Sequence, residues 1–230
     1  MTVINLRHGG HASDTCPRCH RVRSKLHGIP ELTDSPELRE KVIGPIWTNL
    51  KTDRDLLDGR DRDWFMMGVL EAKIGNKEHL LVASSGGPNN LPWITGKHLK
   101  GIAYKRGWTL AETPESRIAV PATQNGWRTV MGMDVQLAGV PVQNIGQPCA
   151  AVKLLLKLAE LNTAHEKVRD LHISEQVVVY GDRIPPNMRQ YHGKGADGSP
   201  SSTWTAHSCA QCEARIPYLI CDVPANQILA

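Results

Sequence analysis

The chain has 230 residues, of which 40% are apolar and 22% charged, so it can bury a sizeable core as one domain or as one domain with an appendage. Its net charge of +4 suits a nucleic-acid partner but falls short of a strongly basic footprint. No apolar run is long enough to span a membrane and the first residues lack a signal-peptide core, so we expect no membrane segment and a cytoplasmic, reducing location.

Six cysteines occur in the chain and include two Cys-x-x-Cys pairs, a spacing that favours metal binding over disulfides in a chain without an export signal. Cys16 and Cys19 are followed directly by His20, and we interpret these three residues as a candidate second metal site that is structural and closed. His8, His11 and His27 lie nearby, and two of these histidines could complete the site together with the two cysteines. Two other interpretations stay open: free thiols on a frayed tail, or one ribbon-type site shared with Cys209 and Cys212.

The first half of the chain contains one predicted helix and one predicted hairpin. Ser35 is a suitable N-cap and Pro36 a suitable first helical residue, so a short helix is expected there. Strands are predicted at 65–72 and 79–84, because a Gly-Asn-Lys turn separates two apolar runs. The following segment, about 86–146, is rich in Gly, Pro, Thr and Trp, and we interpret it as an insertion.

The second half of the chain is predicted to alternate between helices and strands. A helix with a leucine stripe is expected from Pro148, and a second, polar helix over 163–171. The β-branched run at 176–180 is typical of a strand that is buried on both faces. A further helix that carries Cys209 and Cys212, with Ser208 as its N-cap, is expected to end at Pro217, before a strand at 218–223. This order predicts a layered α/β domain with a mixed sheet flanked by helices.

Three cysteines fall in the first turns of predicted helices. In the first turn, unpaired backbone N–H groups and the helix dipole favour thiolate over thiol, and this applies to Cys149. Cys209 and Cys212 would share one face of their helix, so they can bind one ion together. With Cys149 they would form a three-thiolate zinc site whose fourth position is open to water.

The triplet Cys-Ala-Ala at 149–151 and the Cys-x-x-Cys motif at 209–212 resemble the cytidine deaminase superfamily, especially its bacterial toxin branch, whose first motif reads Cys-Ala-Glu. The resemblance covers roughly residues 64–223. It implies a three-layer cytidine deaminase-like fold over 63–230 that holds Zn²⁺, preceded by an N-terminal extension over 1–62.

The catalytic glutamate of this family falls at position 151, where the chain has Ala151. In the family mechanism, zinc lowers the pKa of its bound water, and the glutamate carries the proton from that water to the ring and to the departing ammonia. Glu160 lies farther along the same helix and Glu213 on a different face from the ligands, so neither replaces it. The protein is therefore expected to be nearly inactive as written, either as an engineered Glu→Ala form or as a natural pseudoenzyme.

The resemblance implies a zinc-dependent hydrolase that deaminates a cytosine-type base, in single-stranded DNA or RNA because a duplex would require base extrusion. Trp204 is a candidate to stack on that base, or else a residue that fills a gap in the core. A toxin of this branch would be delivered as a module and would bind an immunity protein. Two alternatives stay open: a non-catalytic zinc module that binds nucleic acid or protein, and a deaminase of a nucleoside or other metabolite.

Overall fold

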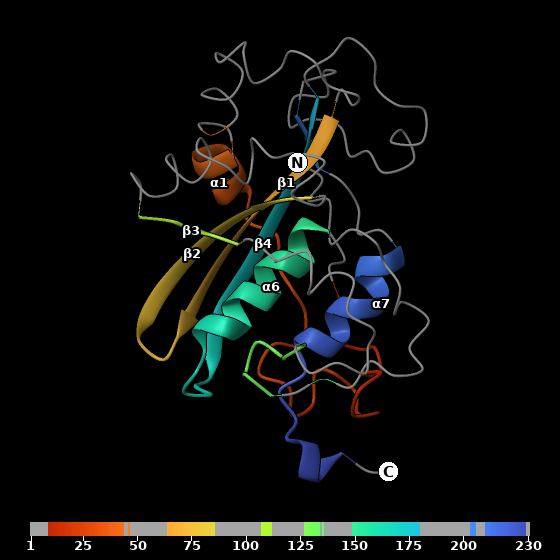
Figure 1. Ribbon diagram of the computed structural model, residues 1–230. Coiled ribbons are helices and arrows are strands. Elements are labelled where there is room, and N and C mark those ends of the chain that lie inside the picture. The colour runs from red at the N-terminus through yellow and green to blue at the C-terminus, as the bar shows by residue number, and fades with distance from the viewer. Residues whose placement is uncertain are drawn as a thin grey trace.

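A computed structural model describes the protein at residues 9–43, 46, 64–85, 107–111, 127–133, 135, 149–179, 203–205 and 210–228. These residues form an α/β fold in which α6 and α7 lie on one side of a long, twisted sheet (Figure 1). Most of the predicted insertion and Cys209 lie outside the described residues. Within the described part, no helix is long and apolar enough to cross a lipid bilayer.

The sheet has five strands in the order β3-β2-β1-β4-β5. Strand β3 runs parallel to β2 and every other pair is antiparallel, which confirms the predicted mixed sheet. The short β3 comes from the predicted insertion, so this segment extends one edge of the sheet. The strands are β1 (Trp64–Ile74), β2 (Lys77–Ser84), β3 (Thr109–Leu110), β4 (Val168–Val179) and β5 (Thr203–Thr205).

The β1–β2 hairpin is the prediction that the structure matches most closely. Gly75 opens its two-residue turn with φ 57°, a left-handed conformation that glycine adopts without steric cost. The strand β4 pairs with β1 and contains a bulge, because two residues, Asp170 and Leu171, stand opposite Ala72. The bulge changes the alternation of β4, so Val168 also faces the core.

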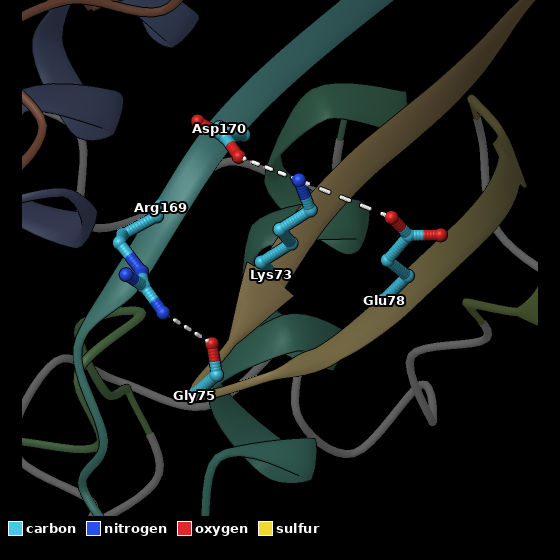
Figure 2. Close-up of polar contacts among 5 residues, drawn as sticks. All are labelled: Lys73, Gly75, Glu78, Arg169 and Asp170. Carbon is cyan, nitrogen blue, oxygen red and sulfur yellow. Dashed lines mark hydrogen bonds and ion pairs between the residues drawn. The ribbon is translucent and has the colours of Figure 1, made fainter.

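Polar contacts fix the bulge against the hairpin (Figure 2). The Nζ of Lys73 lies 2.9 Å from Oδ2 of Asp170 and 3.9 Å from Oε1 of Glu78. Arg169 donates a hydrogen bond to the carbonyl of Gly75 (2.7 Å). The Lys73–Asp170 pair and the Arg169–Gly75 hydrogen bond join β4 to the turn end of the hairpin, and Asp170 itself has φ 50°.

The helices α6 (Ala150–Leu161) and α7 (Ala210–Leu219) lie on one face of the sheet, and α6 packs on β1 and β2. The close approach of α6 depends on Gly68 of β1, because a Cβ there would lie 3.1 Å from the Cβ of Ala150 and from Cδ1 of Leu154. Aliphatic side chains from both layers form the main core, among them Leu70, Leu81, Leu154, Leu155, Leu158, Ile173 and Ile216.

A short helical segment covers the opposite face. It consists of α1 (Pro36–Leu38) and the π-helical turn η1 (Arg39–Ile43), which contacts β1 and β4. The predicted N-cap is confirmed, since Ser35 Oγ accepts a hydrogen bond from the N–H of Leu38 (3.2 Å). The hydroxyl of Ser174 on β4 lies 2.7 Å from the carbonyl oxygen of Ser35 and so attaches the segment to the sheet.

Three predictions for the second half are wrong. The helix expected over 163–171 is a turn followed by β4, because the amide side chain of Asn162 bonds to the backbone of Glu166 and ends the helical path. Pro217 lies inside α7 instead of ending it, and the N–H of Ile220 still bonds to the carbonyl of Ile216 (3.1 Å). Buried side chains on this turn offset the hydrogen bond that proline removes. Residues 218–223 therefore do not form a strand.

The N-terminal residues that the structure describes are packed against the main domain. Ile29 and Leu32 belong to the main core. Gly9, with φ 84°, lies so close to α7 that a Cβ there would be 2.7 Å from Cγ2 of Ile216. The segment that precedes β1 therefore contributes to the same hydrophobic interior.

Candidate metal centre

A tight loop near the N-terminus brings the first Cys-x-x-Cys pair into the protein interior. The N–H of Cys16 donates to the carbonyl of Arg21 (2.9 Å), and the N–H of His20 donates to the carbonyl of Cys16 (2.8 Å). His20 takes the left-handed φ of 58° that this reversal requires. Cys16 and Cys19 are 0% and 2% exposed, so the loop presents both thiols inward. We call this loop the knuckle, residues 15–22.

Two residues from elsewhere in the chain complete a group of four metal-binding side chains. His27 follows the knuckle, and its Nε2 lies 3.3 Å from Sγ of Cys19. Cys221 comes just after α7 and is fully buried. The four donor atoms of Cys16, Cys19, His27 and Cys221 all lie within 4.8 Å of one another. This buried group could hold a metal ion.

The observed group overlaps only in part with the predicted one. Cys16 and Cys19 are in it, whereas His20 is exposed and lies outside it. In the sequence His27 is one of several nearby histidines, and nothing local distinguishes it. Cys221 was expected in a strand, and no sequence pattern connects it to a knuckle some 200 residues away. Cys212, considered for a shared ribbon-type site, is not part of the group.

Two arginines provide positive charge beside the thiols. The Nη1 of Arg18 lies 3.2 Å from Sγ of Cys221 and 2.5 Å from the carbonyl oxygen of Val223. Arg23 is 1% exposed and donates a hydrogen bond to the carbonyl of Gly9. Burial lowers the pKa of Arg23, and negative charge on nearby side chains, including the carboxylates of Asp14 and Glu31, acts against that shift. A buried guanidinium is stabilised by anionic neighbours, and three thiolates around a metal would supply them.

The thiols of Cys16 and Cys221 share one hydrogen bond. It raises the pKa of Cys16, and burial raises it further. The same bond lowers the pKa of Cys221 to about 4 against the opposing effect of burial, and the hydrogen bond from Arg18 lowers it too. A lowered pKa favours the thiolate of Cys221, and thiolate is the form that binds metal ions.

The structure describes two of the three cysteines in the predicted catalytic zinc site. Cys149 is the N-cap of α6, with φ −64° and ψ 155°, and its side chain makes no capping hydrogen bond. It is half-buried and packs against the main core cluster, which includes Cys212 from the first turn of α7. Cys209 lies outside the described residues, so the three-thiolate site stays a prediction.

A buried carboxylate lies at the start of α6, beside the position where the deaminase resemblance requires glutamate. Ala151 is 0% exposed, and its N–H donates a 2.8 Å hydrogen bond to Oε1 of Glu175. Glu175 belongs to β4, is 4% exposed, and stands opposite Gly68. The missing side chain of Gly68 leaves room for it, because a Cβ there would lie 3.3 Å from Cγ of Glu175. Sequence reasoning missed Glu175, since its position depends on strand pairing.

The remaining predicted site residues lie in places that the structure describes only in part. Trp204 is in β5, where its backbone pairs with Val177 of β4, and its role in base stacking stays a prediction. Of the two glutamates considered above, Glu160 pairs with Lys157 (3.0 Å) and Glu213 is exposed, so neither lies with Ala151 in the core. Comparison with family models, with curated proteins and with solved structures found no match to the chain.

Proposed function

We propose that the protein binds one Zn²⁺ through Cys16, Cys19, His27 and Cys221. The observation that carries this proposal is the buried group of four donor atoms within 4.8 Å of one another. Three thiolates and one imidazole form a common ligand set of structural zinc, and soft thiolate ligands disfavour Mg²⁺ and Ca²⁺. Sulfurs bound at about 2.3 Å to tetrahedral zinc lie about 3.8 Å apart, a spacing that the group can adopt with little movement.

The proposed role of this zinc is structural. The protein supplies all four ligands, so no position is left for water or substrate. The ion would join the knuckle to the chain that follows α7, two segments that are far apart in sequence but contribute to one small buried cluster with Val223. Because the unfolded chain has no preformed site, the free energy of zinc binding would add to the free energy of folding.

Metal analysis of the purified full chain tests this proposal. We expect the protein, purified under reducing conditions and dialysed, to retain zinc, and Co²⁺ in its place to give the intense absorption of tetrahedral thiolate coordination. Cys221→Ser should lose one equivalent of metal. Leu26→Ala should retain it, because the side chain of Leu26 lies in the same region but is 71% exposed. Equal metal content in both variants would contradict the proposal.

We also propose a catalytic function for a second part of the molecule: zinc-dependent hydrolytic deamination of a cytosine-type base. The proposed ligands are Cys149, Cys209 and Cys212, as the sequence resemblance implies. The observation that favours this function is the Glu175 carboxylate, which is bound to the backbone of Ala151 at the start of the helix that begins after Cys149. Deamination needs a carboxyl group that transfers protons beside the metal, and Glu175 is a buried carboxylate in that region.

A nucleic-acid substrate in single-stranded form is part of this proposal, because the chain carries a net charge of +4 and single strands need no base extrusion. The test measures ammonia release from cytidine, single-stranded DNA, single-stranded RNA and duplex DNA. We expect slow release by the chain as written, none by Glu175→Gln, and faster release by Ala151→Glu. Absence of ammonia release from all three proteins, with metal retained, would exclude the catalytic proposal and leave the structural zinc site unaffected.

A further inference from the structure

His27 has one ring nitrogen facing the metal group and one facing away from it. Its Nε2 lies 3.3 Å from Sγ of Cys19, so this nitrogen is placed to bind the ion. Its Nδ1 is buried and has no hydrogen-bond partner within the described part of the chain. A neutral imidazole that binds a metal through Nε2 carries its proton on Nδ1, and a buried N–H without an acceptor is costly.

A carboxylate oxygen of Asp222 is also buried without a hydrogen-bond partner in the described part of the chain. Asp222 follows the ligand Cys221, and the buried oxygen is its Oδ1. Its other oxygen, Oδ2, accepts a hydrogen bond from the N–H of Gly28, the residue directly after His27. The carboxylate is therefore held against the peptide that carries the ligand.

Glycine at position 28 allows this contact. A Cβ on Gly28 would lie 2.9 Å from Oδ2 of Asp222, closer than Cβ atoms normally approach an oxygen. Burial raises the pKa of Asp222, while the hydrogen bond from Gly28 and the charge of His27 lower it.

We propose that Asp222 is the positioning residue of His27: when Nε2 of His27 binds the metal, its Nδ1–H donates a hydrogen bond to Oδ1 of Asp222. This inference rests on the proposed zinc site and adds a residue that is not a ligand. The bond would fix the tautomer in which Nε2 is free to coordinate, hold the ring in its orientation and increase the electron density on Nε2. It would also satisfy both buried atoms at once.

The test measures metal affinity by competition between the full-length protein and a chelator, with Co²⁺ and Zn²⁺ as the metals. We expect Asp222→Ala and Asp222→Asn to bind each metal about 10 to 100 times more weakly. Asparagine replaces one of the two carboxylate oxygens with an NH2 group that can only donate, so either the N–H of Gly28 or the Nδ1–H of His27 would face a donor instead of an acceptor. Gly28→Ala disturbs the same contact from the other side and should weaken binding in the same direction.

Glu31→Gln is the matched control, because it removes a negative charge whose electrostatic effect also reaches Arg23 beside the group, from a carboxylate that accepts from the N–H of Ala12 (3.4 Å). It should bind metal as tightly as the unmodified protein. If the Asp222 variants bind metal as tightly as this control, the inference is wrong. An equal fall in the melting temperature of the metal-free and metal-loaded forms of Asp222→Ala, with unchanged affinity, would reduce Asp222 to a support for the loop at Gly28. If the unmodified protein binds no metal, the zinc proposal itself fails.

Discussion

The guanidinium of Arg18 connects the proposed ligand Cys221 to the backbone of Val223, with Nη1 at 3.2 Å from the sulfur and 2.5 Å from the carbonyl oxygen. A divalent ion with three thiolates and a neutral imidazole carries one net negative charge. An arginine at this position compensates that charge where the surroundings are mostly buried. The arrangement leads to the first of four predictions.

Arg18→Met should weaken metal binding by about tenfold, because the thiolate of Cys221 loses the donor that stabilises its charge. Arg18→Lys should restore only part of the affinity, since an ammonium cannot reproduce the fixed fork of the guanidinium. Chelator competition measures both. Arg21→Met is the control, because Arg21 is also a knuckle arginine but donates to the carbonyl of Gln227 and not to a sulfur. Equal weakening in Arg18→Met and Arg21→Met would indicate a general charge effect.

Metal removal should release the knuckle. Without the ion, the cluster that contains Cys16 and Cys221 loses its central bonds, and the free energy of unfolding should fall by roughly 3 kcal/mol or more. Trypsin should then cut faster after Lys25, which is exposed in the loop between Cys19 and His27. Denaturant unfolding and a proteolysis time course, each with and without a chelator, check this prediction. Identical digestion rates in both conditions would contradict it.

The Lys73–Asp170 pair should make stability depend weakly on pH (Figure 2). The hydrogen bond from Lys73, together with its charge, lowers the pKa of Asp170. The stabilisation from Asp170 is therefore complete above the ordinary aspartate pKa and is lost as the pH falls through the lowered value. Lys73, whose pKa the pair raises, contributes below the ordinary lysine pKa and loses its contribution as the pH rises through the raised value.

Asp170→Asn should accordingly differ from the unmodified protein at neutral pH and converge with it in acid. Both side chains are exposed, so the difference in melting temperature should be small. A series of thermal unfolding experiments at different pH values measures this difference. Lys73→Met in the same series shows how much of the difference depends on the presence of both side chains. A difference that persists at the lowest pH would mean that another property of Asp170, such as its φ of 50°, determines the effect.

Ala151→Glu should lower the melting temperature, and Glu175→Gln should partly restore it in the double variant. Position 151 is fully buried and its N–H bonds to Glu175, so a second carboxylate would meet a first one in the core. A glutamine at 175 keeps an acceptor for the N–H and removes the repulsion. Thermal unfolding of the two single variants and the double variant forms a complete cycle. Additive effects would show that the two side chains do not meet.

The sequence predicted the parts of the fold that depend on local patterns. Each of three features is specified by residues that lie close together in the sequence: the hairpin of β1 and β2, the start of α6 and the N-cap Ser35. The prediction that a helix ends at Pro217 failed, because the burial of Ile216 and Leu219 in the core outweighs the local helix-breaking effect of proline. Local propensity contains no information about such packing.

Only the part of the metal-binding group that lies within one short segment of sequence was predictable. Cys16 and Cys19 form a recognisable pair, and a closed metal site was expected from them. Cys221 has no motif around it and joins the group of four only because α7 ends beside the knuckle. Glu175 likewise reaches Ala151 through the register of β4 against β1, which depends on a bulge that the sequence does not mark.

The distribution of the four ligands along the chain has a consequence for biosynthesis. Cys221 is synthesised some 200 residues after the knuckle and His27. Until Cys221 is made, Cys16 and Cys19 lack the third thiol of the proposed site, and both thiols are open to oxidants and to competing ions. The four-residue group therefore cannot close before residue 221 is made, and a polypeptide interrupted before that residue would never close it.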